Sequence, residues 1–322
     1  MYEEINEQLE GKYKLTAYPL NIGIEITNNC NLNCIMCNHD KMKRTKGFMQ
    51  LDTYKKIIDE TAIEQPGTRI WLDFYGEALL AGWKLYYMID YAKKAGLTNI
   101  CINTNGTVMK QEYAEMLIDA GVDYISLDCD GFTKEVYESV RVNGDRDKFY
   151  SNVEYLLEYK KKMKSDTIID IKVIELEQNR NEIQQIVEYW KNRGAWTAVR
   201  RCSQWVDENS KSTGKPEMDS RIACGHAMGT AVISWDGIVG GCAFDYDLAM
   251  ACGDIKKESL KNIWTRRNEN FLKLHLEHRW DELPVICKYC SNWENIGEER
   301  IDELGNEIRR NYSAKAMIYE ME

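Results

Sequence analysis

Three cysteines stand close together near the start of the 322-residue chain, in the stretch EITNNCNLNCIMCNHD at residues 25–40. They are Cys30, Cys34 and Cys37, spaced as C-x3-C-x2-C. Thiolates are the usual ligands of iron–sulfur clusters, and a four-iron cluster normally takes four of them. A triplet therefore leaves one iron open to another group. A zinc site completed by His39 is the alternative, although the spacing is not that of a zinc finger.

A second group of cysteines lies in the C-terminal third of the chain, at Cys224, Cys242, Cys287 and Cys290. Four thiolates suit either a complete four-iron cluster or a tetrahedral structural zinc, and the spacing alone leaves both open. The chain has 11 cysteines in all. Because the number is odd and we expect a reducing compartment, metal ligation is favoured over disulfides.

The elements that must position these cysteines follow an alternating pattern. Short β-branched or aromatic segments alternate with amphipathic helical patterns at 51–64, 83–96, 110–121, 150–164 and 181–194, which predicts βαβ units and a parallel sheet. The predicted strands are 21–27, 69–75, 99–104, 123–128, 168–174 and 196–200. Six strands predict a partial α/β barrel, in which chemistry takes place at the carboxyl ends of the strands.

Polar segments follow four of these strands directly. The triplet follows the first strand, FYGEALL (74–80) the second, NTNGT (103–107) the third and LDCDG (127–131) the fourth. Because the carboxyl ends of parallel strands lie at one edge of a sheet, we expect these segments to converge on one opening.

The triplet, with Met36 between its last two cysteines and its place after the first strand, resembles the signature of the radical S-adenosylmethionine (SAM) superfamily. The resemblance implies a partial (β/α)6 TIM barrel and a [4Fe–4S] cluster whose open iron binds the amino and carboxylate groups of SAM. In that family an electron from the cluster cleaves SAM to a 5′-deoxyadenosyl radical.

The same resemblance assigns residues to SAM. Tyr75-Gly76-Glu77 resembles the family's GGE-type motif, which receives the methionyl amino group, although tyrosine replaces its first glycine. Asn103-Thr104-Asn105 resembles the family's TNG turn near the ribose. The residues that the resemblance places at SAM are Met36, Tyr75, Gly76, Glu77, Asn103, Thr104, Asn105, Ser126, Arg141 and Glu175.

The second cysteine group, with Gly253-Asp254-Ile255 and Ile263-Trp264 inside it, resembles the shortened SPASM or twitch domain, which carries an auxiliary [4Fe–4S] cluster. The resemblance is to the branch that contains 2-deoxy-scyllo-inosamine dehydrogenase and radical epimerases. We expect an N-terminal extension at 1–19, the radical SAM barrel at 20–202, a small cysteine-rich SPASM/twitch domain at 203–296 and a C-terminal helical tail at 297–322.

This branch implies a radical reaction on a carbohydrate or an aminocyclitol. The deoxyadenosyl radical removes a C–H hydrogen, and the product is then a ketone, or an epimer if a cysteine returns a hydrogen atom. Cys252 and Cys202 are the expected donors. Modification of a ribosomal peptide remains an alternative. So does a non-catalytic zinc-binding or redox-sensing protein.

Composition limits the partners. The net charge is −10, with 52 acidic and 42 basic residues, which argues against nucleic acid. No segment reaches the roughly 20 apolar residues of a membrane span, and the N-terminus lacks a signal-peptide pattern. We therefore expect a cytoplasmic enzyme that acts on a small molecule or peptide. The resemblance adds a flavodoxin- or ferredoxin-like electron donor.

Overall fold

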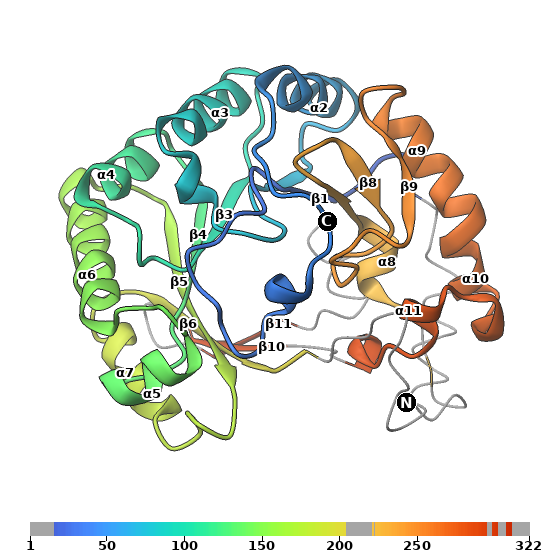
Figure 1. The fold of residues 1–322 in the computed structure, drawn as a ribbon. Helices are drawn as coiled ribbons and strands as arrows, with labels where there is room; N and C mark the ends of the chain where they lie inside the picture. The colour runs from blue at the N-terminus through green and yellow to red at the C-terminus, as the bar shows by residue number, and fades with distance from the viewer. Residues whose placement is uncertain (1–15, 204–220, 222, 295–297, 302–306, 311–322) are drawn as a thin grey trace.

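A single curved sheet organises the protein (Figure 1). The computed structural model describes residues 16–203, 221, 223–294, 298–301 and 307–310. Within them, six strands pair in parallel in chain order, which confirms the predicted barrel. These strands are β1 (Asn21–Ile24), β2 (Arg69–Trp71), β3 (Ile100–Thr104), β4 (Tyr124–Asp128), β5 (Ile168–Glu175) and β6 (Trp196–Arg201).

Helices cover the outside of this sheet, because each follows a strand and returns the chain to the next one (Figure 1). Five of them match the predicted amphipathic segments: α2 (Leu51–Glu64), α3 (Trp83–Lys94), α4 (Gln111–Asp119), α6 (Arg146–Met163) and α7 (Ile183–Lys191). The sequence analysis did not predict α5 (Lys134–Val140) or the short helices η1 (Asn38–Lys41) and η2 (Ala78–Ala81) at strand ends. Every helix in the described residues is too short or too polar to span a bilayer.

The two faces of the sheet differ in chemistry, because successive side chains of a strand point to opposite sides. The outward face is aliphatic: Ile102, Leu127 and Ile171 are fully buried in the main core. The inward face is polar. The residues that lie side by side on this face of β3, β4 and β5 include Asn103, Ser126, Asp128, Asp170 and Lys172. A barrel with a polar interior can hold a polar ligand.

The C-terminal third extends both edges of the sheet. Strand β7 (Thr230–Ile233) pairs in parallel with β1. Strands β8 (Ile238–Gly240) and β9 (Ala251–Asp254) continue antiparallel from it, and Gly237 lies in the turn between β7 and β8 with a positive φ. The helices of this part are α8 (Gly225–Gly229), α9 (Leu260–Arg267), η4 (Asn268–Leu272), α10 (Lys273–Leu276), η5 (Trp280–Glu282), α11 (Val285–Lys288) and η6 (Asn292–Glu294).

The prediction of a helical tail at 297–322 is wrong where the structure describes it. Strand β10 (Glu298–Ile301) pairs antiparallel with β6 and with β11 (Glu307–Arg310). Helical periodicity in a short charged segment is weak evidence, and here the unpaired edge of β6 determines the conformation. Most of the predicted extension at 1–19, residues 204–220 at the start of the predicted SPASM/twitch domain, and the rest of the tail lie outside the described residues.

Candidate functional site

The cysteine triplet lies in the loop that follows β1. Ile24 ends the strand, and the loop runs through Cys30, Cys34 and Cys37 until η1 begins at Asn38. All three side chains border a cavity of about 250 Å³ at the carboxyl ends of the strands. The cavity is also lined by Leu32, Met36, His39, Phe74, Tyr75, Gly76, Glu77, Asn103, Thr104, Asn105, Asp128, Arg141, Ile174, Cys202, Ser203 and Ala243.

The surroundings of the triplet suit thiolates held to a metal cluster. Burial raises the pKa of Cys30 to about 11 and also raises the pKa of Cys34, so both thiols stay protonated unless a metal displaces the proton. Arg141 Nη1 donates to Cys34 Sγ at 3.6 Å, and Asn105 Nδ2 to Cys30 Sγ at 3.9 Å. Three thiols and two N–H donors around one cavity fit a four-iron cluster held at three corners.

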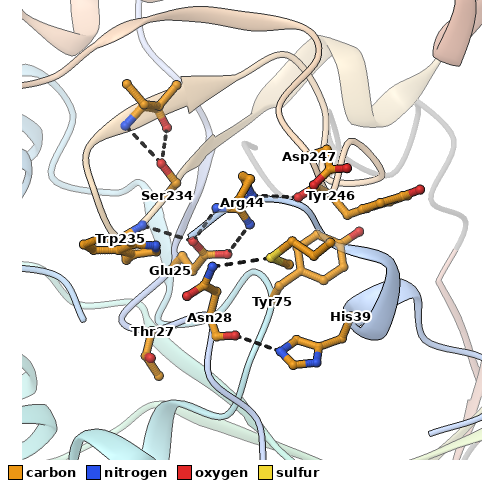
Figure 2. A network of polar contacts seen from close by, with 12 residues as sticks. Glu25, Thr27, Asn28, His39, Arg44, Tyr75, Ser234, Trp235, Tyr246 and Asp247 are labelled. Carbon is orange, nitrogen blue, oxygen red and sulfur yellow. Dashed lines mark hydrogen bonds and ion pairs between the residues drawn. The ribbon is translucent and has the colours of Figure 1, made fainter. Parts of the chain in front are cut away.

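The alternative zinc site required His39 as its fourth ligand. His39 borders the cavity, but its Nε2 donates to the carbonyl oxygen of Asn28 at 2.7 Å (Figure 2). Among the described residues, no three His, Cys, Asp or Glu side chains meet at the spacing of a single metal ion. The ring of His39 instead fastens the loop to the segment before Cys30.

Gly76 brings the loop after β2 against the loop after β1. Its φ is +92°, a conformation that residues with a side chain rarely adopt. A Cβ atom at this position would lie 2.3 Å from the carbonyl oxygen of Thr27 and 2.8 Å from Cα of Asn28. The adjoining N–H of Glu77 donates to the carbonyl oxygen of Asn29 at 2.8 Å. Only glycine therefore allows this approach next to the triplet.

The Glu77 carboxylate is buried and accepts three internal hydrogen bonds. Its donors are the N–H of Leu79 at 3.0 Å, the hydroxyl of Thr104 at 2.7 Å and the N–H of Asn105 at 2.7 Å. Burial raises its pKa, and these bonds oppose that effect. Glu77 thus joins the ends of β2 and β3 while it borders the cavity. Its expected contact with the amino group of SAM stays a prediction.

The structure brings most of the expected SAM residues to the cavity, with two exceptions. Ser126 is fully buried on the inward face of β4 and does not border the cavity, and its Oγ has no hydrogen-bond partner within the described residues. Glu175 also does not border it and forms an ion pair with Arg180 at 3.2 Å. The described geometry thus gives Glu175 a place at the surface rather than beside the cavity.

Charged residues inside the barrel escaped the sequence analysis. Asp73 lies just beyond β2, and its electrostatic neighbours are Lys172, Asp128, Glu77 and Arg200. Burial raises the pKa of Asp73 to about 7, against the lowering effect of Lys172. The ammonium group of Lys172 lies 5.2 Å from the Trp71 ring and 5.9 Å from the Tyr124 ring. The sequence did contain a signal for such a residue: Lys172 is a charged residue at an inward position of the otherwise mostly apolar strand β5.

The four C-terminal cysteines form a second centre. Cys224 precedes α8, Cys242 follows β8, and Cys287 and Cys290 lie in and after α11. Each is an electrostatic neighbour of others in the set, and burial raises the pKa of all four thiols. His275 Nε2 lies 3.2 Å from Cys287 Sγ. Four thiols fit a complete four-iron cluster.

A polar network joins the loop of the first centre to the hairpin of the second (Figure 2). Arg44 donates twice to the Glu25 carboxylate, at 2.8 and 2.7 Å, and through Nε to the carbonyl oxygen of Tyr246 at 2.7 Å. The N–H of Trp235 donates to the same carboxylate at 3.1 Å, and its indole N–H to the carbonyl oxygen of Thr45 at 3.0 Å. The network fixes the two parts of the chain against each other.

The two cysteines expected as hydrogen donors lie in different places. Cys202 follows β6 and borders the cavity. Cys252 lies on β9, at the end of the sheet, where its thiol donates to the carbonyl oxygen of Met250 at 3.3 Å. It does not border the cavity, so the structure does not bring Cys252 beside the triplet.

The family profile of the Radical SAM superfamily matches residues 24–189, which is more than half of the chain. The chain belongs to the radical SAM superfamily. The profile of an iron–sulfur cluster-binding domain, SPASM, matches residues 224–291 and so includes all four cysteines of the second centre. The protein is therefore a radical SAM enzyme whose cofactors are SAM and iron–sulfur clusters. When bound, these cofactors supply an electron and a carbon radical, and the protein supplies the cavity that orients them.

Curated relatives match over part of their length. An AdoMet-dependent heme synthase of Methanosarcina barkeri is 30% identical over 183 residues, which is 56% of this chain and 50% of the relative. A probable GTP 3′,8-cyclase of Methanococcus maripaludis is 26% identical over 173 residues, 53% of this chain and 55% of the relative. The chain thus spans about half the length of the curated relatives it matches.

Solved radical SAM structures share the fold over most of the chain. BtrN in complex with AdoMet and 2-DOIA has a TM-score of 0.59 and 19% identity, covering 84% of this chain and 92% of BtrN. The enzyme anSMEcpe with bound AdoMet has a TM-score of 0.62 and 18% identity, covering 94% and 96%. SuiB of Streptococcus suis, bound to the precursor peptide SuiA, has a TM-score of 0.63 and 12% identity, covering 81% and 68%. At these identities the likeness establishes the fold.

Proposed function

We propose that this radical SAM enzyme removes a C–H hydrogen from a carbohydrate or aminocyclitol substrate and oxidises the adjacent alcohol to a ketone. The observation that supports the proposal is that the cavity of the first centre is lined by a residue from the cysteine loop of the second. Tyr75 and Ala243 both border the cavity of the triplet, and Ala243 directly follows Cys242 of the second centre. A substrate in the cavity would therefore lie close to an acceptor for its second electron.

The chain supplies polar groups for such a substrate. Asn103 and Asp128 border the cavity from the inward face of β3 and β4, where hydroxyl and amino groups would find an amide and a carboxylate. Oxidation of an alcohol also needs an acceptor for the hydroxyl proton. Asp128 borders the cavity, whereas Asp73 does not border it but is an electrostatic neighbour of Asp128. We assign the role to Asp73, which would receive the proton through Asp128, because the pKa of Asp73 is about 7.

The proposed reaction balances as follows. The secondary alcohol loses one hydrogen atom to the 5′-deoxyadenosyl radical, one proton to Asp73 and one electron to the second centre. The products are a ketone, 5′-deoxyadenosine and methionine. An external carrier, which we propose to be flavodoxin- or ferredoxin-like, supplies the first electron and removes the last one.

Epimerisation is the second candidate, and it is favoured by one observation. The thiol of Cys202 borders the cavity, from where it could return a hydrogen atom to the substrate radical. Peptide modification is a further candidate, because the related structures of anSMEcpe and SuiB hold peptides.

The test begins with protein purified without oxygen. We expect about eight irons per chain, the content of two four-iron clusters. With SAM, a reductant and an aminocyclitol deuterated at the reacting carbon, we expect deuterium in 5′-deoxyadenosine and a ketone product. Unlabelled deoxyadenosine with every carbohydrate and aminocyclitol tried would contradict the substrate class, and an epimer with retained oxidation state would select the second candidate. A colourless protein that contains zinc and forms no deoxyadenosine would support a binding or sensing role.

A further inference from the structure

Two buried arginines enclose the second centre. Arg221 is 3% exposed; its guanidinium donates to the carbonyl oxygens of Lys288 at 3.0 Å and Cys287 at 2.8 Å, and to Cys287 Sγ at 3.7 Å. Arg267, the last residue of α9, is 2% exposed and donates to the carbonyl oxygen of Gly241, next to Cys242, at 2.9 Å. Each guanidinium therefore donates hydrogen bonds to the backbone at or next to a cysteine of the centre.

Neither guanidinium forms an ion pair with a carboxylate in the part of the chain that the structure describes. The other neighbours of Arg267 are the side-chain oxygen of Asn268 at 3.2 Å and the rings of Trp264 and Phe271 at 4.6 and 5.2 Å. Arg221 lies 5.0 Å from the Trp280 ring. Within the described residues, the Nε atom of each arginine has no hydrogen-bond partner.

A buried guanidinium stays charged and requires a compensating anion, since an uncompensated buried charge is strongly destabilising. The nearby groups that can carry negative charge are the cysteines. Arg267 is an electrostatic neighbour of Cys252 first, and then of three cysteines of the centre, Cys242, Cys224 and Cys287. Cys252 donates its thiol hydrogen to the carbonyl oxygen of Met250 and is therefore neutral. Arg221 is an electrostatic neighbour of Cys224. The centre therefore provides the anion that both arginines lack.

The first centre has the opposite electrostatic surroundings. The arginine beside its thiols, Arg141, forms ion pairs with Asp130 and, at 3.6 Å, with Asp128. The carboxylate of Glu77 is an electrostatic neighbour of Cys30, while Asp128 and Asp130 are neighbours of Cys34. Carboxylates thus surround the first centre, and two arginines surround the second.

We propose that Arg221 and Arg267 raise the reduction potential of the auxiliary cluster held by Cys224, Cys242, Cys287 and Cys290, and thereby make it the electron acceptor of the enzyme. Reduction adds one negative charge, which two neighbouring cations stabilise. The carboxylates around the triplet act in the opposite direction on the first cluster. This inference rests on the proposed oxidation, in which the substrate radical gives one electron to the auxiliary cluster.

The test measures the midpoint potential of the auxiliary cluster in the full chain, by redox titration followed by electron paramagnetic resonance without SAM or substrate. We expect Arg267→Gln and Arg221→Gln each to lower the ratio of reduced to oxidised cluster about tenfold at the wild-type midpoint, which is 59 mV for one electron. Arg267→Lys keeps the charge and should retain most of the potential. The first cluster serves as an internal reference.

Arg266→Gln is the matched control. Arg266 is the neighbour of Arg267 on the same helix, but it is exposed and pairs with Glu258 at 2.7 Å. We expect it to leave the potential unchanged. Glutamine variants with full iron content and an unshifted potential would overturn the inference, as would zinc at the second centre or an equal shift in Arg266→Gln. If a glutamine variant does not fold, Arg267→Lys provides the test. A lower midpoint potential of the auxiliary cluster in this variant, which keeps the positive charge, would be evidence against a charge effect.

The outcome is independent of the proposed reaction. The potential is measured without substrate, whereas the reaction is identified by its product. Shifted potentials together with an epimer product would uphold the electrostatic effect and reject the oxidation. A ketone product with unshifted potentials would do the reverse.

Discussion

The hydroxyl of Tyr75 donates a hydrogen bond to the carbonyl oxygen of Ala243 at 3.3 Å. Tyr75 replaces the first glycine of the family's motif, and its buried ring has the thiols of both Cys37 and Cys242 as electrostatic neighbours. One side chain thus contacts the loop of the second centre while it borders the cavity of the first. A glycine at this position would remove this contact.

Gly76→Ala should destabilise the protein far more than Gly96→Ala. Both glycines have a φ near +90°, so each alanine pays a similar conformational cost of about 1–2 kcal/mol. Only at Gly76 would the new Cβ collide with backbone, that of Thr27 and Asn28, whereas at Gly96 it meets nothing within 4 Å. Chemical denaturation of the two variants, with iron content measured in parallel, checks this. Equal losses of stability would show that the loops can move apart.

Breaking the ion pair of Arg44 should also destabilise the fold. Glu25 is fully buried, and Arg44→Met would leave its carboxylate without a cation, at a cost of about 3–5 kcal/mol. Replacing both residues, as Arg44→Met with Glu25→Gln, should recover part of this loss. Lys94→Met removes an exposed pair with Asp90 and should change the free energy of unfolding little. A wild-type denaturation midpoint for Arg44→Met would contradict the assignment.

Product formation should depend on the ionisation of Asp73. Burial raises the pKa of this carboxyl to about 7, so its proton-accepting form predominates only above that pH, and ketone formation should rise between pH 6 and pH 8. Asp73→Asn should lower product formation about 100-fold and abolish the rise, while deoxyadenosine still forms. Asp123→Asn, at the opposite end of the barrel, is the control. A pH profile unaltered in Asp73→Asn would assign the proton to another group.

The thiol of Cys202 distinguishes oxidation from epimerisation. If the enzyme oxidises its substrate, Cys202→Ala should leave the yield of ketone per deoxyadenosine near the wild-type value, because no hydrogen atom is returned. Cys252→Ala should behave like wild type in either case, since Cys252 does not border the cavity. Product analysis by mass spectrometry in deuterated water checks both. Loss of product with deoxyadenosine retained in Cys202→Ala alone would favour epimerisation.

Much of the fold could be predicted because its signals are local. The helix predicted over 51–64 is α2 with the same bounds, since its apolar residues recur at helical spacing and Gln65 ends the pattern. The strands were predictable from their aliphatic outward face. The pairing of strands far apart in the sequence could not be predicted. Nothing in the sequence near Thr230 or Glu298 specifies that β7 pairs with β1 or that β10 pairs with β6.

The site shows the same division. The three clustered cysteines and the glycine-bearing strand ends were recognisable from their spacing. Arg221 and Arg267 were not, because a buried arginine and a surface arginine look alike in a sequence. The place of Cys252 was not predictable for a related reason, since its closeness to the second group in sequence did not reveal that it lies on β9, at the end of the sheet and outside the cavity lining.

Strand β1, which leads into the triplet, pairs with β2 on one side and with β7 on the other. It therefore joins the barrel to the C-terminal third of the protein. Neither part can be removed without exposing an unpaired strand edge on the other, so backbone hydrogen bonds fix the distance between the two centres. A hybrid protein with the C-terminal part of another member of the superfamily would therefore have to keep the pairing of β1 with β7.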